Sequence, residues 1–284
     1  FFNPARDALT PSLVPADRLT RANSLIQISA QLAFLAGPAA AGLFAAAVGT
    51  IHMFSLDALT FLASLVTLAL IRLPPAHKRH LEAGPVPLPQ VPPAAGGSWH
   101  ELVEGLRHAW HDRRLRGLLV LTAVENLIIM GPAILGTPVY VREVLGFGEQ
   151  GVQAYALLTA VLFAGMIVSS LVIGMKGRGW PRGKLIVIGI LLDGLTFIPF
   201  FFIRSFGAAC AAMFVHGLTV PMITVPRATL IQKVVPDDRR GRIFALVNLA
   251  VVGCTALSMV LTGLASDHVG MELIYLVAGL AGAA

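Results

Sequence analysis

Long apolar runs limit what this sequence can fold into more than any other feature does. A helix needs about 20 mostly apolar residues to cross a bilayer core about 30 Å thick, because lipid offers no partner for its backbone groups. Only 13% of the 284 residues are charged and 56% are hydrophobic, and the mean hydropathy is +0.78. We therefore predict an all-α membrane protein. The expected complete spans are 24–48, 53–73, 117–141, 152–174, 184–203, 206–226 and 243–265.

The apolar stretches at the two ends of the sequence are shorter than these spans. Residues 1–14 open the chain without a Met or a signal peptide, and the last stretch begins near Leu273. Each stretch has too few residues to cross a bilayer. We therefore expect a chain that is truncated at both ends, lacking its first helices and stopping inside its last one.

Basic residues alternate between successive connections. All but two of the 21 lysines and arginines lie in every second connection, and the remaining connections hold only Arg142 and Arg204. Positively charged loops stay in the cytoplasm, so we place the basic set there. The net charge of +6 and the pI near 9.9 are also found in nucleic-acid-binding proteins, but that interpretation leaves the alternation unexplained, and we expect no nucleic-acid partner.

A proline-rich segment divides the sequence. Its prolines, between 74 and 97, are incompatible with a regular helix and predict a flexible linker. After it, Ser98 and Glu101 have capping-box spacing, and apolar residues recur on one helical face up to Trp110. This pattern predicts an interfacial amphipathic helix at 98–115, whose simplest role is to position the next span. The expected parts are the second half of an N-terminal bundle (1–73), a central cytoplasmic loop (74–116) and a C-terminal bundle with a truncated last helix (117–284).

The sequence also contains an internal repeat. Residues 6–49 align with residues 227–270 without a gap after a shift of 221 positions. Both copies run in the same membrane direction, which indicates two similar bundles related by an axis along the membrane normal. The identities include Arg6 with Arg227, Val14 with Val235, Pro15 with Pro236, Asp17 with Asp238, Arg18 with Arg239, Arg21 with Arg242, Gly42 with Gly263 and Gly49 with Gly270.

Several short motifs carry a family resemblance. They are Phe2-Asn3-Pro4-Ala5, Ala22-Asn23-Ser24, Gly37-Pro38-Ala39-Ala40-Ala41-Gly42 and Val235-Pro236-Asp237-Asp238-Arg239-Arg240-Gly241-Arg242. With them the chain resembles the major facilitator superfamily, in particular macrolide-efflux-like and siderophore-exporter-like bacterial members. The resemblance implies the major facilitator fold, with two parallel-repeat six-helix bundles of which this chain holds about helices 4 to 12. It also implies a multi-pass transporter of the bacterial inner membrane that works as a monomer.

Few ionisable residues lie inside the predicted spans. Glu125 is about 13 Å beyond Arg116 along a helix that rises 1.5 Å per residue, which puts it near the middle of its span, and Asn126 follows it. A charged group at that depth is costly and usually faces a cavity or a partner. We expect Glu125 to exchange a proton as access alternates. The alternatives are a fixed interhelical hydrogen bond and binding of a cationic substrate without titration.

Two further polar residues are candidates for the proton path or the substrate cavity. His216 lies in the span that matches the tenth family helix, and an imidazole changes its charge near neutral pH. The alternative is a histidine that packs with its hydrogen bonds satisfied. Gln31 either faces the cavity or bonds to a neighbouring helix. Asp193, also in mid-span, is expected to be a structural partner rather than a proton carrier.

Other motifs suggest moving parts. Gly37 and Pro38, with Gly42, can loosen the fifth family helix and let another helix approach, so we expect them to form a conformational motif. The duplicated cytoplasmic turn carries charges that can form salt bridges and close one side of the protein, although an ordinary solvated turn is the alternative. The expected gate consists of Asp17, Arg18, Arg21, Asp238, Arg239 and Arg242.

The sequence lacks the patterns of an enzyme. A nucleophile elbow, paired zinc histidines and a phosphate loop are all missing, and Gly183-Lys184 is followed by Leu185 where a phosphate loop needs Ser or Thr. We expect no cofactor and no metal, and His100, His108 and His111 do not form a convincing metal site. The preferred hypothesis is proton-coupled efflux of amphiphilic small molecules by alternating access. The alternatives are metabolite uptake and a non-transporting assembly or sensor protein.

Overall fold

The computed structural model describes residues 2–49, 52–70, 106–107, 109–148 and 151–283. Within these ranges the regular structure is helical, as the apolar pattern predicts. The proline-rich linker, Ser98, His100, Glu101 and His108 lie outside them, and so does half of the predicted amphipathic helix. The α-helices are α1 (Phe2–Leu13), α2 (Leu19–Val48), α3 (Met53–Ala69), α6 (Arg113–Gly131), α7 (Thr137–Val139), α8 (Val152–Lys176), α9 (Arg182–Leu195), α10 (Phe206–Val234), α11 (Asp237–Ser266) and α12 (Met271–Gly282).

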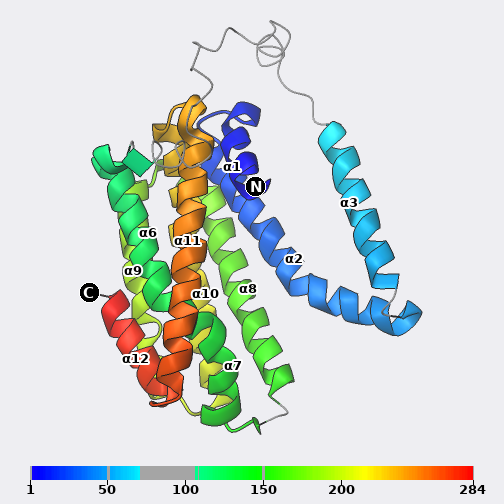
Figure 1. Ribbon diagram of the computed structural model, residues 1–284, viewed down its shortest axis with the longest axis vertical. Coiled ribbons are helices and arrows are strands. Elements are labelled where there is room, and N and C mark those ends of the chain that lie inside the picture. The colour runs from blue at the N-terminus through cyan, green and yellow to red at the C-terminus, as the bar shows by residue number, and fades with distance from the viewer. Residues whose placement is uncertain (1, 50–51, 71–105, 108, 149–150, 284) are drawn as a thin grey trace, which may run out of the picture.

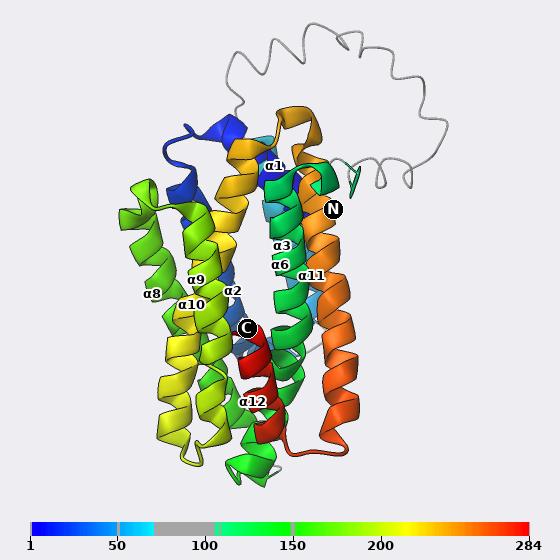
Figure 2. The ribbon, with the colours of Figure 1, turned by 90° about the vertical axis from the view of Figure 1, so that its left-hand side faces the viewer.

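Helices α6 to α12 form an upright bundle, and α1 and the first part of α2 pack against it (Figures 1 and 2). Five stretches of the described residues are long and apolar enough to cross a membrane, whereas α12 and the apolar part of α3 are shorter. Each of the five coincides with an expected span. They are Arg113–Val144, Val152–Gly179, Arg182–Phe201, Phe206–Val234 and Arg239–Ser266.

The first of these spans contains two wider helical turns. π-helical turns at Pro132–Gly136 and Tyr140–Val144 interrupt the regular α-helix on either side of α7. Pro138 fits the first of them, since it has no backbone N–H to donate to Ile134 in that turn and its ring crowds the carbonyl of Ile134. At the other end Asp112 caps α6 by accepting from the backbone N–H groups of Arg114 (2.7 Å) and Leu115 (3.2 Å). The cap fixes where α6 begins and so sets the height of Glu125.

Glycines let the helices of the bundle touch. A Cβ atom at Gly165 of α8 would collide with the carbonyl oxygen of Phe214 on α10, and one at Gly217 would collide with that of Leu162. Gly131 of α6 has no room for a side chain either, and its backbone N–H donates to Ser258 Oγ on α11 at 2.8 Å. Small residues at such crossings are the usual basis of helix association in membranes, where the hydrophobic effect does not act between helices.

The second part of α2 and all of α3 lie away from the bundle (Figure 1). Large apolar side chains on them are uncovered by the rest of the described chain, for example Phe54 at 81% and Phe61 at 70% exposure. The contact between α2 and α8 extends as far as Phe34, whose ring stacks on that of Phe163 at 5.8 Å. Gly37 follows this contact, and a Cβ there would meet nothing within 4 Å.

One expected boundary is wrong. We expected the span beginning at Phe206 to end at Pro226 and Arg227 to lie in a cytoplasmic loop, but α10 continues to Val234. Pro221 and Pro226 are both inside this helix. Arg227 and Lys233 therefore belong to a helix, and Thr229 and Gln232 near its end are buried against other helices of the protein.

Candidate pocket between the two halves

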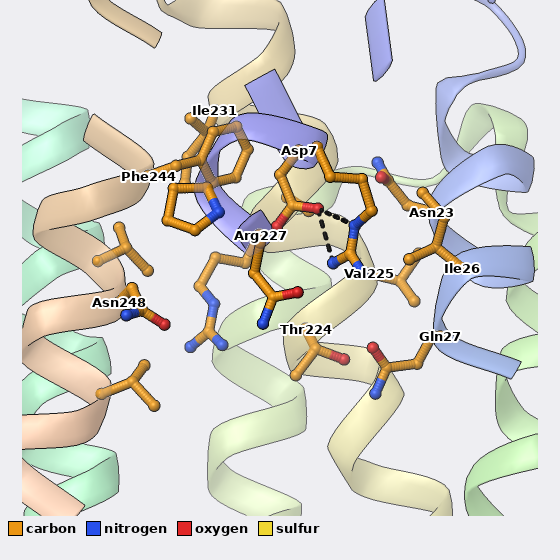
Figure 3. A pocket seen from close by; sticks show the side chains of 16 residues that line it. Asp7, Asn23, Ile26, Gln27, Thr224, Val225, Arg227, Ile231, Phe244 and Asn248 are labelled. Carbon is orange, nitrogen blue, oxygen red and sulfur yellow. Dashed lines mark hydrogen bonds and ion pairs between the residues drawn. The ribbon is translucent and has the colours of Figure 1, made fainter. Parts of the chain in front are cut away.

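A cavity of about 240 Å³ lies between α1 and α2 on one side and α10 and α11 on the other (Figure 3). All but two of its 16 lining residues form pairs separated by the same 221 positions that relate the two repeat copies. The repeat axis therefore runs through this pocket, which places it between the two halves of the protein. The pairs are Asn3 with Thr224, Pro4 with Val225, Arg6 with Arg227, Asp7 with Ala228, Asn23 with Phe244, Ile26 with Val247 and Gln27 with Asn248.

The two equivalent arginines of the pocket have different partners. Arg6 pairs with the neighbouring Asp7, whose Oδ1 is 3.0 Å from Arg6 Nε (Figure 3). Ala228 stands at the position equivalent to Asp7, so Arg227 has no carboxylate beside it on its own helix. Its charge interacts with that of Glu125 on α6, and its Nη1 donates to Thr122 Oγ1 at 3.4 Å.

Glu125 belongs to a buried polar network behind Arg227. Its side chain is 8% exposed, and it does not line the pocket itself. Asn126 Nδ2 donates to Glu125 Oε2 at 2.6 Å and to the carbonyl oxygen of Thr122 at 2.8 Å. Thr255 on α11 donates to Asn126 Oδ1 at 3.3 Å. The network connects α6, α10 and α11 and lies behind the wall of the pocket.

A second set of hydrogen bonds connects the halves directly. Asn23 Nδ2 of α2 donates to Thr229 Oγ1 at 2.9 Å and to Gln232 Oε1 at 2.7 Å, both on α10. Gln232 Nε2 donates to the carbonyl oxygen of Asp7 on α1 at 2.9 Å. These buried bonds join three helices beside the pocket, near the ends that carry the basic turns. We did not select Gln232 or Arg227 from the sequence, although the identity of Arg227 with Arg6 was a signal for the latter.

The residues of the expected gate are spread over the basic end of the protein. Asp17 crosses to the other half, where its Oδ2 lies 3.0 Å from Nη2 of Arg178 in the turn after α8. The side chains of Arg18, Arg21, Arg239 and Arg242 are exposed, and that of Asp238 is outside the described part. Arg240, which we did not select, is only 6% exposed and donates to the carbonyl oxygens of Gln232 and Val235 at 3.2 Å each.

The remaining candidates lie away from this pocket. His216 is 4% exposed and belongs to a separate cluster with Asp193, whose Oδ1 is 3.3 Å from His216 Nδ1. Gln31 is buried on α2, and neither polar atom of its side-chain amide has a partner among the described residues. The surroundings of Pro38 and Gly42 lie outside the described part. The described residues also contain no group of three His, Cys, Asp or Glu that could hold a metal ion.

These features define a multi-pass, all-α membrane protein with a parallel internal repeat and a pocket on the repeat axis. The sequence matches the Major Facilitator Superfamily over residues 1–176 and 151–284, and the chain belongs to that family of transporters.

Its relatives include efflux proteins. The chain is 25% identical to macrolide efflux protein A of Streptococcus pyogenes over 98% of its own length and 66% of the relative's. It is 26% identical to the multidrug efflux pump Tap of Mycobacterium tuberculosis, over 97% of its own length and 63% of Tap's. Macrolide efflux protein A of Enterococcus faecalis is 24% identical over 87% of this chain. The chain thus spans about two thirds of the length of these curated relatives.

Proposed function

We propose that the protein is a secondary active transporter of a bacterial inner membrane that exports amphiphilic small molecules in exchange for protons. Family membership and the names of the efflux relatives support the transport class. The pocket on the repeat axis supports alternating access, because in such folds the two bundles rock about a site between them. The working unit is a monomer, since one chain supplies both sides of the pocket.

The observation that carries the proton coupling is that Arg227 interacts electrostatically with Glu125, a nearly buried carboxylate on α6. Arg227 lines the pocket, whereas Glu125 lies behind it. When Glu125 takes up a proton, the positive charge of Arg227 is no longer balanced and acts on the pocket. A positively charged substrate is then repelled, and loss of the proton restores a pocket that accepts it. Proton binding and substrate binding therefore exclude one another, as exchange transport requires.

The contacts at the basic end close that side of the pocket in this proposal. The bonds of Asn23 with Thr229 and Gln232, and the ion pair of Asp17 with Arg178, join the two halves. These contacts break when the halves separate on the cytoplasmic side. Arg178 lies in the turn after α8, and Asp17 of the other half supplies the carboxylate that pairs with it.

The test measures uptake of a fluorescent, positively charged amphiphile by everted membrane vesicles containing the complete gene product. We expect uptake that stops when the proton gradient is collapsed and that is lost in Glu125→Gln. The matched control is Glu143→Gln, which alters an exposed carboxylate paired with Arg142 and leaves uptake intact. Equal uptake by Glu125→Gln and wild type would remove Glu125 from the mechanism.

Two other outcomes point to the alternative functions. Uptake of a solute in right-side-out vesicles, driven by an inward gradient, would indicate a metabolite importer. Absence of transport of every amphiphile tested, by a protein that is folded and inserted, would favour an assembly or sensor protein with the same fold.

A further inference from the structure

A second cavity lies inside the C-terminal bundle and shares no lining residue with the pocket on the repeat axis. Its volume is about 290 Å³. Its lining residues come from the span that contains α6 and α7, from helices α8, α10 and α12, and from the turn after α9. Its walls are mainly aromatic rings and methionines, which suit an apolar, planar group. The aromatic lining residues are Tyr155, Phe163, Phe197, Phe200 and Tyr275.

Three hydroxyl groups of this cavity are occupied within the protein. Thr137 Oγ1 donates to the carbonyl oxygen of Ala133 at 2.7 Å, so the hydroxyl of Tyr275, 3.2 Å away, donates to Thr137 Oγ1. Thr159 Oγ1 donates to the carbonyl oxygen of Tyr155 at 2.9 Å. Each of these hydrogens already has an acceptor, so the polar lining groups left to be considered are the hydroxyl of Tyr155 and the ring of His216.

The hydrogen bonds around His216 determine which ring nitrogen carries a proton. Thr196 Oγ1 donates its hydrogen to the carbonyl oxygen of Asp193 at 2.6 Å, so it can only accept from His216 Nδ1 at 2.9 Å. Asp193 Oδ1, an acceptor held by Thr219 Oγ1, lies 3.3 Å from the same Nδ1. Nδ1 therefore carries the hydrogen, and in a neutral imidazole Nε2 is then an acceptor.

Nε2 takes part in none of the hydrogen bonds found among the described residues. Because Nδ1 is directed at α9 and His216 lines the cavity, Nε2 is the nitrogen left for a ligand. An acceptor that is left without a donor in an apolar cavity costs free energy, and a ligand that supplies the donor recovers it. The ring of Phe197, perpendicular to that of His216 at a centroid distance of 4.8 Å, helps to fix its orientation.

We propose that this cavity binds an aromatic group of one or two rings that carries a hydroxyl or N–H donor, with the donor bonded to His216 Nε2. The volume is at the lower end of the range for small-molecule pockets, which excludes larger ring systems. Binding here requires no proton gradient and does not involve Glu125. The proposal therefore stands or falls separately from proton-coupled export.

The test compares two probes of similar shape, 1-naphthol, which has a donor, and 1-methoxynaphthalene, which has only an acceptor. Both are titrated calorimetrically into the purified complete gene product in detergent. We expect 1-naphthol to bind about 3- to 10-fold more tightly, as one hydrogen bond to a buried acceptor provides. His216→Phe keeps a ring but has no acceptor, so it should abolish this preference and leave binding of 1-methoxynaphthalene nearly unchanged.

Two controls complete the test. His268→Phe makes the same change at an exposed position after α11 and should retain the preference, which corrects for partition of the probes into detergent. Thr159→Phe fills the cavity from α8 and should weaken binding of both probes more than tenfold, a result that does not depend on folding of His216→Phe. Equal affinities of the wild type for the two probes, or unchanged binding to Thr159→Phe, would overturn the proposal.

Discussion

The two repeat copies place equivalent arginines at the pocket but give them different electrostatic surroundings. Arg6 pairs with its sequence neighbour Asp7, and both side chains are partly exposed. Arg227 faces Glu125, which comes from another helix and is nearly buried. The repeat thus determines the position of each arginine. The residue that follows it, Asp7 in the first copy and Ala228 in the second, determines which carboxylate the arginine interacts with. Only the second copy has a charge balance that depends on a buried carboxylate.

The duplicated basic turn shows the same kind of divergence. Leu19 and Arg240 occupy equivalent positions, separated by 221 residues, and both are buried, with exposures of 2% and 6%. Leu19 fills its site with an apolar side chain, whereas Arg240 donates to the carbonyl oxygens at the end of α10. The side chain at this position is therefore buried in both copies, but it is apolar in the first copy and charged in the second.

The largest expected difference between the copies concerns the two arginines of the pocket. Arg227→Met removes the charge that acts on buried Glu125 and should lower the free energy of unfolding by about 1–3 kcal/mol, the usual cost of leaving a buried polar group without its partner. Arg6→Met should cost less than about 1 kcal/mol, because its pair with Asp7 is partly solvated. Thermal unfolding in detergent measures both, and combining Arg227→Met with Glu125→Gln should restore most of the loss. Similar losses in the two single variants would contradict the comparison.

Arg240→Leu makes the second turn resemble the first. The carbonyl oxygens of Gln232 and Val235 lose their buried donor, so we expect a destabilisation of about 1–3 kcal/mol in spite of the apolar replacement. Arg239→Leu, one residue earlier and exposed, serves as the control and should change the unfolding midpoint little. An Arg240→Leu protein as stable as wild type would mean that the two turns are interchangeable.

Asn23→Ala tests the contact between the halves. Asn23 bonds to Thr229 and Gln232, whereas Phe244, its equivalent in the other copy, has no such polar group. We expect a loss of about 1–2 kcal/mol and a shift toward the form open at the cytoplasmic side, seen as faster labelling of a cysteine introduced at Gln27. Asn248→Ala, also at the pocket, is the control. Unchanged labelling would exclude Asn23 from closure.

The smallest effect is expected at Asp17. Its partner Arg178 is 77% exposed at the side chain and Asp17 is 45% exposed, so water and salt weaken their attraction. Asp17→Asn should therefore change stability by less than about 1 kcal/mol, and the difference should vanish at high ionic strength. A loss that persists in molar salt would show that the pair contributes more than a solvated contact does.

Hydropathy predicted the class of fold and five of the spans well, because exclusion of water from lipid acts on every residue of a span. It misplaced the end of α10, since the polar residues after Pro226 are stabilised by Asn23 and Glu125 on other helices rather than by water. The contact between Asp193 and His216 could not be predicted from the sequence either. It depends on how α9 and α10 are rotated against each other, which the sequence of neither helix specifies.

The glycine crossing of α8 and α10 has a consequence for the stiffness of the molecule. At Gly165 and Gly217 the backbones of the two helices are in direct contact, so neither helix can slide along the other without a collision. We therefore expect the two helices to behave as one rigid unit. The contacts between the halves are of another kind, side-chain hydrogen bonds and an ion pair that water can replace. In the alternating-access movement that we propose, we therefore expect α8 and α10 to move together and the contacts between the halves to change.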